Sequence, residues 1–242
     1  MNTRLLAVLA ALASLAAARP AAAQDFGDIA AFVGLVTTPV GSLPPLPLTP
    51  PIADGAVPPR FDLRYGRWKF DGDDAAQHTV GAGLRFGAGG GQGSLTASYM
   101  TCDGCDGAVG LGLELTAALV QPTGGQSSAF SVGVRPSLGV ARSFGDAEGT
   151  SYSASLGLPI GLHVRSAGGA EFVPFVIPGF GYGGVSGDGE SESGTRFMLG
   201  GGVGVANLSG GLGVHVGFQK IFLEDAPTQF GVGLSFGGGR GR

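Results

Sequence analysis

The chain has 242 residues and a formal net charge of −4 at pH 7, and only 13% of its residues are charged. The acidic balance disfavours nucleic acid as a partner, because a phosphate backbone is bound by clustered lysine and arginine. Glycine accounts for 48 residues. A hydrophobic content of 43% with regular spacing nevertheless argues against a disordered secreted chain.

The first 23 residues have the parts of an export signal. Arg4 supplies positive charge, residues 5–18 form an apolar run, and small residues precede a predicted cleavage between Ala23 and Gln24. The apolar run is too short for a transmembrane helix, which needs about 20 residues. The sequence therefore predicts a protein that leaves the cytoplasm and loses its signal.

Residues 24–59 form a proline-rich N-terminal segment. Eight of the 15 prolines of the chain fall between Pro39 and Pro59. Proline lacks the amide hydrogen that a strand donates to its neighbour, so such a stretch is unsuited to the inside of a sheet. We expect an extended segment outside the folded domain, with an inserted plug as the alternative.

From residue 60 onward, apolar residues alternate with small or polar ones, a period that puts each set on one face of a strand. The second face carries glycine, serine, alanine and isolated charges, not the long charged side chains of a water-facing sheet. This combination predicts an all-β fold, a single up-and-down antiparallel transmembrane β-barrel of about ten strands, with eight or twelve as alternatives. We assign residues 60–236 to the barrel and residues 237–242 to a short Gly/Arg tail. The strands are predicted at residues 60–70, 78–87, 93–101, 108–120, 129–144, 152–166, 171–185, 195–207, 212–223 and 229–236.

The connections between these strands are of two kinds that alternate along the chain. Five of them contain 12 of the 18 acidic residues, and the four in between contain none. Alternate connections of an up-and-down barrel lie at opposite ends, so the sequence predicts two chemically different rims. The acidic connections carry Asp71, Asp73, Asp74, Asp103, Asp106, Asp146, Glu148, Asp188, Glu190, Glu192, Glu224 and Asp225.

Polar and charged residues recur on the face that we assign to the barrel interior. About eight strands leave an interior just filled by side chains, so ten leave little more than a narrow passage. Opposite charges there can form an ionic plug, which we favour, or a pore constriction or ligand site. The predicted lumen cluster is Arg64, Arg85, Glu114, Arg135, His163, Arg196 and His215, with Asp62, Arg165 and Gln219 on the same face.

Aromatic residues tend to fall near the predicted strand ends, for example Trp68, Tyr99 and Phe236. Girdles of aromatic side chains at the two membrane interfaces would give this distribution. The alternative is that aromatic residues simply favour strands.

Two further groups of residues are of types found in redox, metal or catalytic sites. Cys102 and Cys105 could form a redox pair, half of a zinc site or a small disulfide; without a thioredoxin-like setting or further ligands, we predict a disulfide that tightens an exposed loop. His78, close to Asp73 and Asp74, is the only grouping that resembles a catalytic one, and we interpret it as a polar rim residue. The sequence predicts no catalytic residue, no cofactor and no metal site.

The chain resembles Gram-negative outer-membrane β-barrel proteins of the small porin-like, OmpA/OmpX-like type. Besides the export signal, the resemblance rests on the last strand, where Gln229, Gly231, Leu234 and Phe236 match the signal that such barrels present to their insertion machinery. Six residues follow the aromatic that usually ends the chain. The resemblance implies the bacterial outer membrane as location, with membrane lipid, lipopolysaccharide and the barrel-assembly machinery as partners; the oligomeric state stays open.

These features predict a non-enzymatic protein that is either structural or a narrow passive channel. One alternative is an adhesin-like surface protein that binds through its acidic loops. Another is a lipid- or peptide-processing barrel enzyme, which a clustered histidine and acid at one rim would favour. A soluble secreted sandwich is a weaker alternative.

Overall fold

The computed structural model describes residues 56–69, 76–88, 91–102, 105–120, 128–144, 149–187, 190–208, 211–222 and 228–237. The predicted signal peptide, most of the proline-rich segment and most of the tail lie outside these residues. The described strands are β1 (Ala56–Lys69), β2 (Ala76–Ala88), β3 (Gly91–Cys102), β4 (Cys105–Val120), β5 (Ser128–Ser143), β6 (Thr150–Gly157), β7 (Ile160–Arg165), β8 (Glu171–Gly187), β9 (Glu190–Leu208), β10 (Leu212–Phe222) and β11 (Thr228–Phe236).

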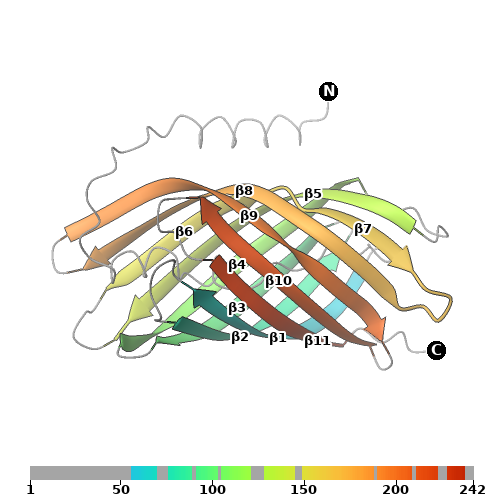
Figure 1. Ribbon diagram of the computed structural model, residues 1–242, viewed down its shortest axis with the longest axis horizontal. Helices are drawn as coiled ribbons and strands as arrows, with labels where there is room; N and C mark the ends of the chain where they lie inside the picture. Colours follow the sequence, from blue (N-terminus) through green and yellow to red (C-terminus); the bar gives the residue numbers. More distant parts are fainter. Residues whose placement is uncertain are drawn as a thin grey trace.

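The strands form one closed antiparallel barrel (Figure 1). Each strand pairs with its neighbour in the chain, and β11 closes the ring on β1 with Phe236 opposite Phe61 and Thr228 opposite Lys69. Since β6 and β7 occupy the same place between β5 and β8, the barrel has ten strand positions. The predicted fold class is confirmed, including the number of strands.

The division between β6 and β7 marks a proline in the wall of the barrel. The register of β5 is the same on both sides, with Arg135 opposite Gly157 and Val132 opposite Ile160. Pro159 has no amide hydrogen to donate, so the ladder is interrupted there without a slip. Its carbonyl still accepts a hydrogen bond from the Gly133 amide at 2.9 Å.

The first strand begins four residues earlier than predicted. Pro58 and Pro59 lie inside β1, and the pairing of β1 with β2 shifts register between Val57 and Arg60. A shift of this kind tolerates a missing ladder donor, which explains why two prolines can stand there. Our prediction that the proline-rich segment stays outside the sheet through residue 59 is therefore wrong for its last four residues.

The two ends of the barrel follow from the topology. We call the end that carries the β1–β2, β3–β4, β5–β6, β8–β9 and β10–β11 connections the acidic rim, and the opposite end, where β1 begins and β11 ends, the terminal rim. Figure 1 shows the β8–β9 hairpin and the β7–β8 connection at opposite ends of the barrel. In the β7–β8 connection, which has no acidic residue, Gly169 takes a φ of 83° and its amide donates to the Ser166 carbonyl.

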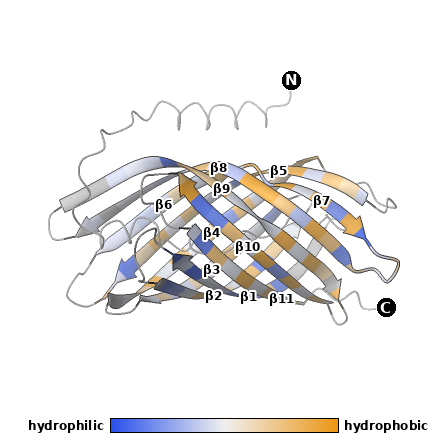
Figure 2. Cartoon of the chain, in the orientation of Figure 1, coloured by the Kyte–Doolittle hydropathy of each residue, from blue (hydrophilic) through white to orange (hydrophobic). Residues whose placement is uncertain are grey.

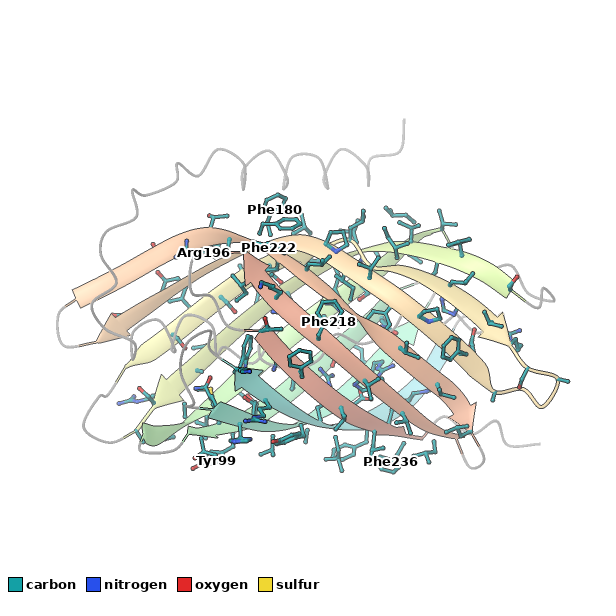
Figure 3. All side chains as sticks on the ribbon, in the orientation of Figure 1. Tyr99, Phe180, Arg196, Phe218, Phe222 and Phe236 are labelled. Atoms are coloured by element: carbon teal, nitrogen blue, oxygen red, sulfur yellow. The ribbon has the colours of Figure 1, made fainter. Side chains whose placement is uncertain are left out.

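The wall is apolar outside and polar inside. Along β11 the residues alternate, with Phe230, Val232 and Leu234 exposed and Gln229 and Gly231 buried. Hydrophobic residues recur along the strands (Figure 2), and the labelled aromatic side chains of Tyr99, Phe180 and Phe236 project away from the barrel (Figure 3). Because an apolar surface that surrounds the whole molecule is stable only against lipid, the outer face is the membrane-facing one.

The lipid-facing assignment can be tested on β5. Leu138 lies near the middle of this strand and Phe130 near its terminal-rim end, and both side chains are exposed on the outer face. We expect Leu138→Arg to reduce the free energy of unfolding by about 2–4 kcal/mol and Phe130→Arg by about 0–1 kcal/mol, because the cost of a charge falls from the membrane midplane toward the interface. Urea unfolding of the refolded protein in phospholipid vesicles measures both. Equal costs would contradict the assignment.

Candidate functional site: the barrel lumen

Most of the polar side chains that the sequence assigned to the interior lie in the lumen. Arg64, Arg85, His163 and His215 are buried there, as are Asp62 and Gln219. Glu114 and Arg135 also face inward and are only slightly exposed. Their placement follows from the period of two along each strand.

One carboxylate organises the lumen beside β1 and β2. Asp62 is fully buried and accepts two hydrogen bonds from Arg85, from Nη2 to Oδ1 at 2.7 Å and from Nε to Oδ2 at 3.2 Å. Arg64 Nη2 lies 3.9 Å from Asp62 Oδ2. The residue opposite Asp62 on β2 is Gly83, where a Cβ would lie 3.1 Å from the Leu95 carbonyl oxygen and 3.2 Å from Thr96 Oγ1, so a larger residue would be crowded there. A two-point guanidinium–carboxylate contact is the strongest polar interaction described in this barrel.

A second ion pair extends this cluster across the lumen. Arg135 Nε lies 3.7 Å from Glu114 Oε2, with exposed side-chain fractions of 13% and 15%. The charges of Glu114 and Arg135 also act on Arg64. We call Asp62, Arg64, Arg85, Glu114 and Arg135 the arginine–carboxylate network.

A row of large polar side chains fills the lumen nearer the acidic rim. Gln77, Trp68, Gln229 and Gln219 are paired in register across β2, β1, β11 and β10, and all four face inward. Trp68 is fully buried, so our prediction that it belongs to an interfacial aromatic girdle is wrong. The alternation that assigned Asp62 and Arg64 to the interior also places Trp68 there, so position near a strand end was the wrong signal for this residue.

Three buried residues near the terminal rim form a hydrogen-bonded relay. The Ser131 hydroxyl lies 2.7 Å from His163 Nε2, and His163 Nδ1 lies 2.9 Å from Glu171 Oε1. Arg165 Nη2 lies 3.7 Å from the same carboxylate oxygen. The Ser131–His163–Glu171 relay joins β5, β7 and β8 just beyond the interruption at Pro159. Glu171 was recognisable as the only acid beside the non-acidic connections, whereas nothing in the sequence distinguished Ser131 from other inward serines.

The relay has the connectivity of a nucleophile, a base and an orienting acid. The space around it is small, however. Ser131 is only 2% exposed, and a Cβ built on Gly161 would lie 3.1 Å from its Oγ and 3.6 Å from His163 Nε2. A single methyl group would therefore be crowded beside the hydroxyl. The geometry suits a structural tie between strands better than a site that receives a substrate.

Other predicted site residues are not brought together. Arg196 is partly exposed toward the acidic rim and donates from Nη1 to its neighbour's carbonyl, that of Thr195, at 3.2 Å. His215 lies in the lumen over Gly233, where a Cβ would be 2.2 Å from His215 Nε2. His78 faces outward and interacts with Tyr65.

The structure describes the backbone of the two cysteines and contains no metal-binding cluster among its described residues. The backbone register places Cys102 opposite Cys105 across the β3–β4 hairpin, but both side chains lie outside the described part of the structure, so the disulfide stays a prediction. Among the described residues, no three His, Cys, Asp or Glu side chains converge in a way that could hold a metal ion. No helix in the same residues is long and apolar enough to cross a membrane.

The network predicts unequal costs for removing its two carboxylates. Asp62→Asn leaves Arg85 and Arg64 buried without their partner, which we expect to reduce the free energy of unfolding by up to about 3–5 kcal/mol. Glu114→Gln breaks a longer and more exposed pair and should cost clearly less. Urea unfolding in vesicles measures both, and a larger cost for Glu114→Gln would contradict the central role of Asp62.

Comparisons with known proteins add the following. No protein-family model and no curated protein matches the chain. Similar solved structures include the β domain of the Bordetella autotransporter BrkA (TM-score 0.44, 16% identity, 74% of this chain and 98% of that one), the attachment invasion locus protein Ail of Yersinia pestis (0.35, 15%, 75% and 97%) and the translocator domain of the Neisseria meningitidis autotransporter NalP (0.34, 13%, 76% and 88%).

The fold is established by the pairing of the chain's own strands. A closed ring of ten antiparallel strand positions, apolar on the outside and polar within, is the architecture of a transmembrane β-barrel, and this chain has that fold.

Proposed function

We propose that this protein is a structural component of the bacterial outer membrane, with a lumen that is closed to solutes. Of the two non-enzymatic roles that the sequence left open, structural barrel and narrow passive channel, the packing supports the first. The single observation behind this choice is the burial of the lumen: Asp62, Arg64 and Arg85 fill it beside β1 and β2, and the Trp68 row fills it nearer the acidic rim. Side chains just fill a barrel of about this size.

The location and the assembly route belong to the same proposal. The export signal supplies the address, and the terminal strand with Gln229, Gly231, Leu234 and Phe236 is the segment that the assembly machinery would recognise. Support comes from the place of β11, which completes the ring by pairing with β1. The acidic rim then faces the cell exterior, and the terminal rim faces the periplasm.

The two alternatives differ in what favours them. Adhesin-like binding would depend on the acidic connections, and most of their residues lie outside the described part of the chain. A barrel enzyme is favoured by the pairing of His163 with Glu171 near one rim, and Ser131 completes the set. The crowding at Gly161 supports the structural interpretation of this relay instead.

The closed lumen predicts the electrical behaviour of the purified protein. In planar bilayers we expect no steady conductance from the wild type. The variant Asp62→Ala/Arg64→Ala/Arg85→Ala/Trp68→Ala removes the charged side chains beside β1 and β2 and the largest side chain of the row nearer the acidic rim, and should give discrete conductance steps. Arg67→Ala, on the outer face of the same strand, is the matched control and should stay silent. Steady conductance through the folded wild type would show that the protein is a narrow channel.

The relay predicts resistance to a serine-directed reagent. Because Ser131 has no room for an added group, we expect no adduct at Ser131 when the folded protein is treated with a fluorophosphonate, as read by peptide mass spectrometry. An adduct at Ser131 that His163→Gln abolishes, and that Ser137→Ala on the same strand leaves intact, would instead establish the enzyme alternative.

A further inference from the structure

Among the residues whose side chains the structure describes, the charged ones on the outer wall are all basic. Every carboxylate with a described side chain (Asp62, Glu114 and Glu171) faces the lumen. The outward-facing basic residues all lie toward the acidic rim, and they are Arg67, Lys69, His78, Arg142 and Lys220. The wall toward the terminal rim carries no charge among the described residues. The described part of the lipid-facing surface therefore has a cationic belt toward the acidic rim.

The tyrosines follow the same division. All four of them face outward in the half of the wall toward the acidic rim, and they are Tyr65, Tyr99, Tyr152 and Tyr182. Tyrosine places its ring in the apolar layer and its hydroxyl among polar headgroups. The belt thus lies at the level of the headgroups in one leaflet.

Within this belt, two lysines and a threonine share one register row. Lys69 on β1 lies opposite Thr228 on β11, and Thr228 lies opposite Lys220 on β10. Directly paired residues of an antiparallel ladder point to the same face. Two strand spacings separate the lysine backbones by about 10 Å. Their long flexible side chains can converge over the threonine, which adds a hydroxyl donor.

More basic residues lie beside this row. Arg67 is on the same face of β1, two residues before Lys69, and is opposite His78 on β2. The Tyr65 hydroxyl and His78 Nδ1 share a hydrogen bond of 2.6 Å, and the two rings are stacked with centroids 5.9 Å apart. Four of the five outward basic residues are thus gathered over β10, β11, β1 and β2, and Arg142 on β5 stands apart.

We propose that Lys69, Thr228 and Lys220 bind the phosphate of a lipid headgroup, and that this lipid carries a phosphomonoester, as lipid A-type glycolipids do. Two ammonium groups match the charge of about −1.5 to −2 that a phosphomonoester carries near pH 7, whereas the phosphodiester of an ordinary phospholipid carries one negative charge. Arg67 supplies further positive potential at the edge of the site. The inference rests on the proposed location in the outer membrane, since the belt faces lipid only there.

The test uses the full exported chain, refolded in zwitterionic detergent and titrated with purified lipid A, with bound lipid counted by native mass spectrometry. We expect Lys69→Gln and Lys220→Gln each to weaken binding about fivefold. If both lysines hold one phosphate, the fold-loss of affinity in the double variant should be smaller than the product of the fold-losses in the two single variants. Arg142→Gln removes an outward cation at the same rim and should leave the affinity unchanged.

Three results would overturn the proposal: unchanged binding in the double variant, an equal loss with Arg142→Gln, or equal binding of phosphatidylglycerol and lipid A. Folding is checked in each variant by heat-modifiable migration in electrophoresis. Lys69→Arg retains the charge, so this variant should keep most of the wild-type affinity that Lys69→Gln loses. Conductance through the wild type would overturn the closed lumen and leave lipid binding unaffected, so the two proposals fail in different experiments.

Discussion

Every backbone amide and carbonyl of a membrane-spanning wall must be paired within the protein, and this chain meets that demand by closing β11 onto β1. Closure fixes the alternation of faces, because each strand must present one set of side chains to lipid and the other to the lumen. It also restricts where proline can stand. Pro58 and Pro59 occur where the register of β1 shifts, and Pro159 interrupts a strand whose register is the same on both sides. Pro136, Pro174 and Pro178 stand inside strands whose register is continuous, so the wall also tolerates a lost donor where the neighbouring pairs keep the strands in register.

Closure around ten strand positions creates an interior that inward side chains must fill. Because these positions alternate with lipid-facing ones, the sequence can fill them with polar groups without disturbing the outer surface. The charges then have to pair, since a buried unpaired charge is costly. An ion pair of this kind adds little stability over apolar residues of the same volume. Its contribution is to hold Arg85 and Arg64 at defined positions around Asp62, as the proposed closed lumen requires.

Much of the wall was predictable from the sequence, and the contacts inside it were not. A period of two over ten segments determines strand number, order and facing, so Asp62, Arg64 and Arg85 were placed in the lumen correctly. Their pairing depends on the register of β1 and β2, which periodicity cannot supply. Position near a strand end misplaces Trp68 in the girdle, whereas the period of two that places Asp62 and Arg64 inside also places Trp68 there. The Ser131–His163–Glu171 relay was missed because its three members lie on three strands.

The lipid-phosphate site depends on the same closure that forms the wall. Thr228 is the first residue of the last strand, and only its pairing with both β1 and β10 places it between Lys69 and Lys220. An open barrel, with β11 not yet joined to β1, would hold these lysines apart. A lipid that binds both would therefore bind the closed state in preference and stabilise it by mass action. On this view the membrane's own lipid favours the final step of assembly, and the cationic belt is a part of the closing mechanism as well as an anchor in one leaflet.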